Sequence, residues 1–375
     1  MRPYALVLAL GLASCSAAAT SPMISPQSDA QQSIIPRVQS AMTNQSAAPT
    51  LHAFTAGTTP GFLSSAAAWD VAPGAGGSMW FTDPGTPAIG TITETGTVHE
   101  YTGLPLYSKP YSIVSDGNGD AWFTDGGTAS VGRITAGGSI KEFTDPKLAN
   151  TYPSDITIDR SNTVWFIATG PRSVLGEISP SGKLTTQYVA SDLSPDGSLI
   201  ADNSGNLWFF AMNNANFRTA MVEHRADGTV TRYFTKMQPG FEPCCPNLAP
   251  KRLAIGPDGN VWFTTLNEVV INSPANWIGN FTPTGSESLR WVRSGSIHYP
   301  AYPSGITSAN GLLWFTGDDP FQLNGGLWSM TTSGTMTAYP ISYNPVGIVA
   351  GKQNHLWFTS HFGGQPSQIV EVTLP

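Results

Sequence analysis

From residue 50 to the C-terminus, short apolar segments alternate with turns rich in Gly, Asp, Asn and Pro. Within this pattern a Trp-Phe pair follows a small or apolar residue seven times, at intervals of 42 to 54 residues. A repeat of this length that carries four short strand signals is typical of β-propeller blades. The seven tryptophans are Trp80, Trp122, Trp165, Trp208, Trp262, Trp314 and Trp357.

The second copy of the repeat shows its parts most clearly. Residues 110–114 are apolar, and residues 116–119 (Asp-Gly-Asn-Gly) form a turn sequence that tolerates positive φ. Segments 121–125, 130–135 and 139–143 complete four predicted strands, from the innermost to the outermost. Large aromatic side chains in the second strand suit packing between neighbouring sheets. The pattern therefore predicts an all-β chain, a seven-bladed β-propeller of four-stranded blades with the Trp-Phe pairs in its core.

The two ends of the repeat region predict how the ring closes. The last copy ends after its third strand, at residues 368–373. Residues 50–55 resemble the outer strand at residues 97–102, yet they precede the first full blade. We predict that a strand near residues 50–56 completes the last blade, which would remove an exposed edge and close the ring.

The N-terminus predicts export. Arg2 and an apolar run at residues 4–12 precede Leu12-Ala13-Ser14-Cys15, which resembles the bacterial lipobox, whose cysteine is lipidated. Cleavage after Ala19, behind three alanines, is the alternative. The lipobox interpretation predicts a protein of the bacterial cell envelope that is lipid-anchored through Cys15. The alternative predicts a secreted or periplasmic protein.

These signals divide the chain into three parts. Residues 1–15 are the predicted signal peptide, and residues 50–375 are the predicted propeller. Between them, residues 16–49 contain few large apolar side chains. Such a segment cannot bury enough surface to fold, so we expect a flexible tether.

Composition and charge exclude two classes of partner. Only 11% of the residues are charged, and the net charge of −7 provides no basic surface for nucleic acid. Apart from the lipid anchor we expect no membrane contact, because no apolar run approaches the roughly 18–20 residues of a transmembrane helix. We expect a monomer whose partner is a small molecule, a peptide or a glycan.

Two further cysteines are adjacent, Cys244 and Cys245. In an oxidising compartment adjacent cysteines can close a strained vicinal disulfide. The alternative is a pair of free thiols in a loop.

The blade formula, Pro-x-Gly-Ile, then Trp-Phe-Thr, then Ile-Gly-x-Ile-Thr, resembles the virginiamycin B lyase (streptogramin B lyase) propellers. The resemblance covers about residues 50–375, and residues 122–125 (Trp-Phe-Thr-Asp) and 131–135 (Val-Gly-Arg-Ile-Thr) carry it most specifically. It implies a seven-bladed propeller and a carbon–oxygen lyase. Members of this family open a cyclic depsipeptide by elimination, with a histidine base and a magnesium ion held by glutamates.

This sequence departs from the family at those positions. Asn344 stands where the resemblance places one metal-binding glutamate, and His361 stands where it places the other. Val346 and Ser304 follow blade-opening prolines, where the family has its histidines, and none of the six histidines follows such a proline. The resemblance therefore names magnesium as a cofactor without identifying a catalytic or metal-binding residue in this chain.

Loops that enter the inner strands share one face of a propeller with loops between the second and third strands. Asp83, Asp125, Asp318 and His361 occupy such loops in four neighbouring blades, so they are candidate ligand-binding residues. The alternative is that each aspartate caps a turn. Several loops of blades four to six are longer than those of blade two, which predicts an enlarged rim where function concentrates. Neutral variation of surface loops would give the same lengths.

The leading hypothesis is an exported propeller that binds a ligand or partner at this rim. A second is a lyase that acts on a cyclic depsipeptide or lactone with rearranged residues, and a third is an envelope scaffold for another protein. A channel blocked by side chains beneath an aromatic rim would favour binding. Three protein oxygens around a metal over the channel would favour an enzyme.

Overall fold

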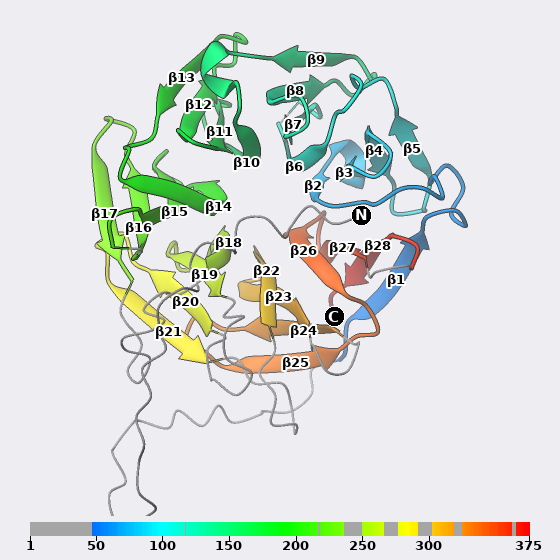
Figure 1. Cartoon of the computed structure of the whole chain (residues 1–375). Coiled ribbons are helices and arrows are strands. Elements are labelled where there is room, and N and C mark those ends of the chain that lie inside the picture. Colours follow the sequence, from blue (N-terminus) through cyan, green and yellow to red (C-terminus); the bar gives the residue numbers. More distant parts are fainter. Residues whose placement is uncertain are drawn as a thin grey trace, which may run out of the picture. The chain divides into compact units, whose positions relative to one another are not determined.

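A computed structural model describes residues 47–116, 118–216, 218–235, 250–265, 277–291, 302–318, 325–361 and 365–375. These residues form seven antiparallel sheets of four strands each. The sheets follow one another around a ring in chain order, as Figure 1 shows. The predicted fold class is therefore confirmed. The described part of the chain has no helix that is long and apolar enough to span a membrane.

In the first six blades the chain runs from the innermost strand to the outermost. The first three blades are β2 (Val71–Pro73), β3 (Met79–Asp83), β4 (Ala88–Ile92) and β5 (Val98–Tyr101); β6 (Pro110–Ser115), β7 (Ala121–Asp125), β8 (Ser130–Ile134) and β9 (Ile140–Phe143); and β10 (Tyr152–Ile158), β11 (Val164–Thr169), β12 (Val174–Ile178) and β13 (Leu184–Tyr188). Two short 3₁₀ helices, η1 (Ala75–Gly77) and η2 (Pro146–Leu148), lie in loops of this part.

The remaining four blades continue around the ring. They are β14 (Leu193–Ala201), β15 (Leu207–Asn213), β16 (Thr219–His224) and β17 (Val230–Phe234); β18 (Pro250–Ile255), β19 (Val261–Thr265), β20 (Trp277–Phe281) and β21 (Glu287–Trp291); β22 (Tyr302–Ala309), β23 (Leu312–Asp318), β24 (Gly325–Met330) and β25 (Met336–Pro340); and β26 (Pro345–Ala350), β27 (His355–Ser360), β28 (Gln368–Thr373) and β1 (Thr50–Thr55). The last blade therefore takes its outer strand from the start of the repeat region.

This closure joins the two ends of the repeat region. β1 pairs with β28 along its whole length, from Thr50 opposite Thr373 to Thr55 opposite Gln368. Phe54 is buried, and its ring stacks on that of Trp357 at a centroid distance of 5.9 Å. The predicted closing strand is therefore confirmed, and it contributes core packing as well as backbone hydrogen bonds.

The Trp-Phe repeat has a packing explanation. Each second-strand Phe is buried, and in blades one, two, three and five it faces a Gly on the third strand. A Cβ atom on any of these glycines would lie only 2.1–2.2 Å from the Phe ring. The ring therefore occupies the volume that a side chain would need. The pairs are Phe81 with Gly90, Phe123 with Gly132, Phe166 with Gly176 and Phe263 with Gly279.

Six of the seven repeated tryptophans are also buried, as predicted. Trp165 differs, since it is only partly buried. Its indole N–H donates to the Asp159 carboxylate at 2.9 Å, as the indoles of the buried Trp208 and Trp262 donate to Asp202 and Asp258.

Candidate functional site

Every inner strand carries one residue at the same register, directly before a buried apolar side chain. These positions contact the neighbouring inner strands around the ring, whose order Figure 1 shows. They differ from blade to blade, in contrast to the Trp-Phe pairs. In chain order they are Asp70, Ser112, Asp155, Ser198, Arg252, Gly305 and Gly347.

On one side of the ring these residues connect three blades. The Ser112 hydroxyl lies 3.1 Å from Asp70 Oδ2 and 2.7 Å from Asp155 Oδ1. Asp155 Oδ2 accepts the backbone N–H of Leu199, in the next blade, at 2.6 Å. Asp155 is buried, so these partners satisfy oxygens that water does not reach.

The opposite side has less side-chain volume. The Leu253 N–H still donates to the Ser198 hydroxyl at 3.0 Å. Blades six and seven have glycines in this register, and a Cβ on Gly305 would lie 2.7 Å from the backbone nitrogen of Ile348. Glycine thus allows two inner strands to approach closely. At Gly347 the nearest atom of the described residues to an added Cβ is Asp70 Oδ1, at 3.7 Å.

Arg252 extends from blade five toward the residues of blades one to three. Its Nη1 lies 3.8 Å from Asp155 Oδ1. Burial raises the pKa of the Asp155 carboxyl, opposed by Arg252 and by the hydrogen bonds from Ser112 and Leu199. Burial lowers the pKa of the Arg252 guanidinium, but Asp155, Asp70 and Tyr111 outweigh this effect and leave it above its ordinary value. Charged and hydrogen-bonded side chains therefore connect the inner strands of blades one, two, three and five.

Four aromatic rings lie in sequence at the starts of the neighbouring inner strands β2, β6 and β10 and at the end of β27. The His361 ring contacts Trp69 at a centroid distance of 5.9 Å, and Trp69 contacts Tyr111 at 4.8 Å. Tyr111 contacts Tyr152 at 5.9 Å. We call His361, Trp69, Tyr111 and Tyr152 the aromatic arc. It spans blades seven, one, two and three, whose inner strands are neighbours in Figure 1.

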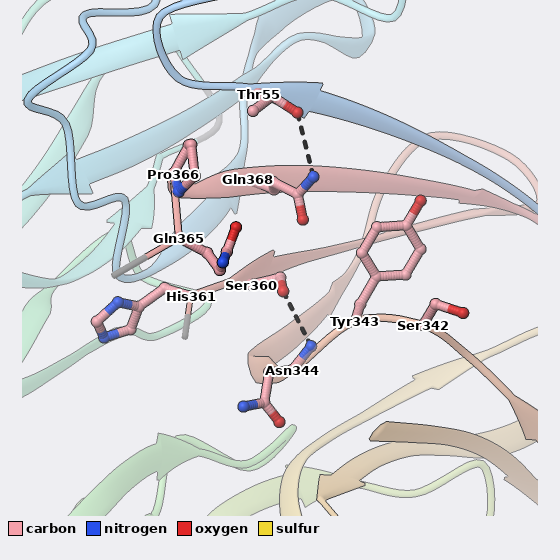
Figure 2. Close-up of a pocket in the computed structure, with 9 residues that line it drawn as sticks. All are labelled: Thr55, Ser342, Tyr343, Asn344, Ser360, His361, Gln365, Pro366 and Gln368. Carbon is pink, nitrogen blue, oxygen red and sulfur yellow. Dashed lines mark hydrogen bonds between the residues drawn. The ribbon is translucent and has the colours of Figure 1, made fainter. Parts of the chain in front are cut away.

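A pocket of about 360 Å³ adjoins the aromatic arc in blade seven. It lies between the loop before β26 and the loop after β27, and Figure 2 shows its lining. Most of the lining groups are neutral and polar. They include the amides of Asn344, Gln365 and Gln368 and the hydroxyls of Thr55, Ser342 and Ser360. The described lining contains no Lys, Arg, Asp or Glu.

His361 belongs to both the pocket and the aromatic arc. Figure 2 shows His361 at one end of the lining residues and Tyr343 and Ser342 at the other, with Gln365 and Ser360 between them. The His361 backbone N–H donates to the carbonyl of Asn344 at 3.3 Å, and its side chain is exposed. Of the predicted candidates, His361 therefore lies where it can touch a ligand.

Asp83 and Asp125 are in different surroundings. Both are buried, and each uses Oδ1 to accept three backbone N–H groups from two loops, at 2.7–3.2 Å. Burial raises the pKa of the Asp83 carboxyl, partly offset by these hydrogen bonds. The geometry matches the turn-capping alternative, in which the carboxylates hold loops in place.

The remaining candidates fall largely outside the described structure. Asp318 ends β23, where its backbone pairs with Gly325, but its side chain is outside the described part. Cys15, Cys244 and Cys245 lie outside the described residues, as do much of the tether and of the enlarged rim. Those predictions remain as they stand.

The sequence interpretation missed Trp69, Tyr111 and Tyr152. Tyr111 directly follows the proline that opens its inner strand, and Trp69 holds the same register in blade one. This is the register in which the resembled family carries its histidines. Reading this position in every blade, for any residue type, would have found both.

The magnesium ion that the resemblance implies does not fit the residues present. A hard cation prefers several oxygen ligands. Asn344 and His361 stand at the expected glutamate positions, and together they offer one amide oxygen and an imidazole. Within the described ranges, no group of three or more His, Cys, Asp or Glu side chains could hold a metal. The family's metal-assisted elimination therefore does not transfer to this chain residue by residue.

Comparisons with known proteins agree with the blade pattern. The sequence profile of the virginiamycin B lyase family matches residues 60–240, which include the first four blades up to β17. No curated protein matches the sequence. A solved streptogramin B lyase structure is similar, with a TM-score of 0.66 at 22% identity, over 88% of this chain and 98% of that chain.

Two further solved structures are similar. One is a catalytically inactive histidine-to-alanine variant of virginiamycin B lyase from Staphylococcus aureus with quinupristin; its TM-score is 0.67 at 23% identity, over 87% of this chain and 100% of that chain. The other is YCF48 bound to D1 peptide, with a TM-score of 0.57 at 16% identity, over 87% and 97%. At these identities the structural likeness establishes the fold.

The closed ring and its blade formula define the class of the protein, a seven-bladed β-propeller. Within that class, residues 60–240 match the virginiamycin B lyase family profile, and the fold is similar to that of a solved streptogramin B lyase.

Proposed function

We propose that this chain is an exported, lipid-anchored propeller that binds a ligand on the face around the channel and does not act as a lyase by the family mechanism. One observation carries the proposal: a network of Asp70, Ser112, Asp155 and Arg252 links the inner strands beside the aromatic arc. Aromatic rings with a few oriented polar groups are typical of ligand sites. The expected histidine base and carboxylate ligands are replaced at their positions.

Binding is tested with thermal shifts of the full chain. The ligands are quinupristin, unmodified peptides and short oligosaccharides. We expect at least one class to raise the melting temperature, since a ligand of the folded state stabilises it. The rise should disappear in Tyr152→Ala and persist in Tyr188→Ala. These tyrosines are 37% and 39% exposed and lie in the same blade, but only Tyr152 belongs to the aromatic arc. No shift with any class would contradict the proposal.

A lyase with rearranged residues is the second candidate, favoured by the family match and by His361 beside the pocket. Incubation with quinupristin and Mg²⁺, followed by mass spectrometry, separates the two functions. We expect the cyclic molecule to remain closed. Ring opening that is lost in His361→Ala or Asp318→Asn would replace the binding proposal with an enzymatic one.

Export through Cys15 is tested separately. The Leu12-Ala13-Ser14-Cys15 sequence supports lipidation. We expect the wild-type chain expressed in bacteria to incorporate labelled palmitate and the Cys15→Ser variant to incorporate none. Equal labelling of the two chains would reject the lipid anchor.

A further inference from the structure

The chemistry of the pocket limits what it can hold. Its amides each present donors and an acceptor, and its hydroxyls can both donate and accept. The described lining has no Lys, Arg, Asp or Glu, so apart from the His361 imidazole its polar groups are neutral amides and hydroxyls. A ligand with many hydroxyl groups and no net charge satisfies such a lining best, because each hydroxyl also both donates and accepts.

A peptide would need a different pocket. Peptides are usually held by an apolar or aromatic anchor side chain in a desolvated pocket. Here only Tyr343 and Pro366 offer large apolar surface among the lining residues. Burying an apolar anchor against Asn344 and Gln365 would leave amide groups without partners, which costs free energy.

The aromatic arc continues from the pocket through His361. Its centroid spacings of 5.9, 4.8 and 5.9 Å are close to the length that one pyranose unit adds to a sugar chain. The C–H face of a pyranose is apolar and can pack on an aromatic ring. Successive rings are inclined by 62°, 37° and 77° and do not share one plane, so a sugar chain that follows them must bend from one ring to the next.

Beside the aromatic arc, Asp70 provides carboxylate acceptors and Arg252 provides guanidinium donors. Polar groups therefore continue from the pocket toward the inner strands, where they are charged and the Asp70 carboxylate already accepts hydrogen bonds from within the ring.

We propose that the pocket and the aromatic arc form one continuous site for a neutral oligosaccharide, with one end of the sugar chain in the pocket and successive units along the rings. This inference rests on the proposed binding function and names the class of its ligand.

The test uses the full chain and a panel of immobilised probes: short neutral oligosaccharides of hexose or N-acetylhexosamine units, acidic oligosaccharides and unmodified peptides. We expect retention of at least one neutral oligosaccharide. Its affinity should fall about tenfold or more, equivalent to about 1.4 kcal/mol, in both Tyr152→Ala and Asn344→Ala. Asn344→Ala keeps the fold contacts, because the described hydrogen bonds of Asn344 use its backbone. Tyr188→Ala is the control and should bind as the wild type does.

The outcomes test the oligosaccharide inference separately from the proposed ligand-binding function. Retention of peptides alone, lost in Tyr152→Ala, would overturn the oligosaccharide inference and leave the binding function intact. A neutral oligosaccharide bound equally by wild type, Tyr152→Ala and Asn344→Ala would place the sugar elsewhere and overturn the site. No retention of any neutral oligosaccharide would also overturn the inference, and thermal shifts with quinupristin or peptides would then decide the function.

Discussion

The second strands repeat with the same period as the seven inner-strand positions from Asp70 to Gly347, which we call the channel register. The two sets nevertheless carry contrasting residues. In the second strands a Trp-Phe pair recurs in all seven blades, and every Phe is buried. At the channel register the residue is acidic, basic, a serine or a glycine, depending on the blade. Packing between sheets admits few solutions because interiors are close-packed. The inner-strand positions meet different neighbours in each blade, from the buried Asp155 to the close approach at Gly305, so they differ from blade to blade and can form a site.

The strongest test of this contrast removes the closing strand. A chain that begins at Gly61 lacks β1, and therefore loses the β28 pairing and the buried Phe54 ring. Loss of a buried Phe side chain alone costs about 3–5 kcal/mol. We expect the free energy of unfolding to fall by at least this amount. Urea denaturation measures the change. The control is a chain that begins at Ala47, and equal midpoints for the two chains would show that closure contributes little.

A smaller effect is expected where a Phe ring lies over glycine. In Gly132→Ala the new Cβ would lie 2.1 Å from Phe123 Cζ, so the ring or the strand must move. We expect a loss of about 1–3 kcal/mol in the free energy of unfolding, as for other overpacked cores. Gly137→Ala is the control, because the nearest atom to its Cβ is 3.8 Å away, and it should change stability by less than about 0.5 kcal/mol. Equal effects would mean that the ring does not limit the third strand.

The parts of the fold that were predictable from sequence are those set by local signals. In blade two the predicted strands differ from β6, β7, β8 and β9 by at most one residue at either end. Each strand there is bounded by turn residues and marked by its own apolar pattern. Closure by β1 was also predictable from the number of strands at the two ends. The last blade lacked an outer strand, and one extra strand preceded the first blade.

The site was only partly predictable. His361 was identified from its loop position, and the register after the blade-opening proline could have found Tyr111 and Trp69. The ring contacts that join the arc cross four blades, and no local pattern encodes them. The approach of Arg252 to Asp155 likewise joins blades five and three, which are distant in sequence. Asp83 was predicted as a candidate but caps a turn. An Asp after a strand has the same sequence signature whether it binds a ligand or caps a turn.

The buried carboxyls predict how stability depends on pH. Burial raises the pKa of Asp83, and burial together with the Asp83 charge raises that of Glu100. A carboxyl whose pKa is raised by folding stabilises the fold below its ordinary pKa, and this contribution is lost as the pH rises through the raised value. We expect the free energy of unfolding of the wild type to decline over that range.

Asp83→Asn isolates this effect, because an amide oxygen can still accept the three backbone hydrogen bonds and carries no charge. The stability of the variant relative to the wild type should increase as the pH rises from acidic to neutral. Urea denaturation at several pH values measures the slope. The control is Asp227→Asn, because the backbone N–H of Thr229 lowers the pKa of the Asp227 carboxyl and the difference should therefore run in the opposite direction. Equal slopes in the two variants would reject this role for Asp83.

The smallest effect is expected where the two regions meet, at the end of β27. Trp357 is buried in this strand, and His361 follows it by four residues with an exposed side chain. We expect His361→Ala to change the free energy of unfolding by less than about 0.5 kcal/mol, because its backbone hydrogen bond to Asn344 remains. Trp357→Ala, in the same strand, should cost about 3–5 kcal/mol. Comparable losses of stability in the two variants would mean that His361 belongs to the packed core between the sheets. The contrast between a uniform core and a variable channel face would then fail at the point where the two regions are closest.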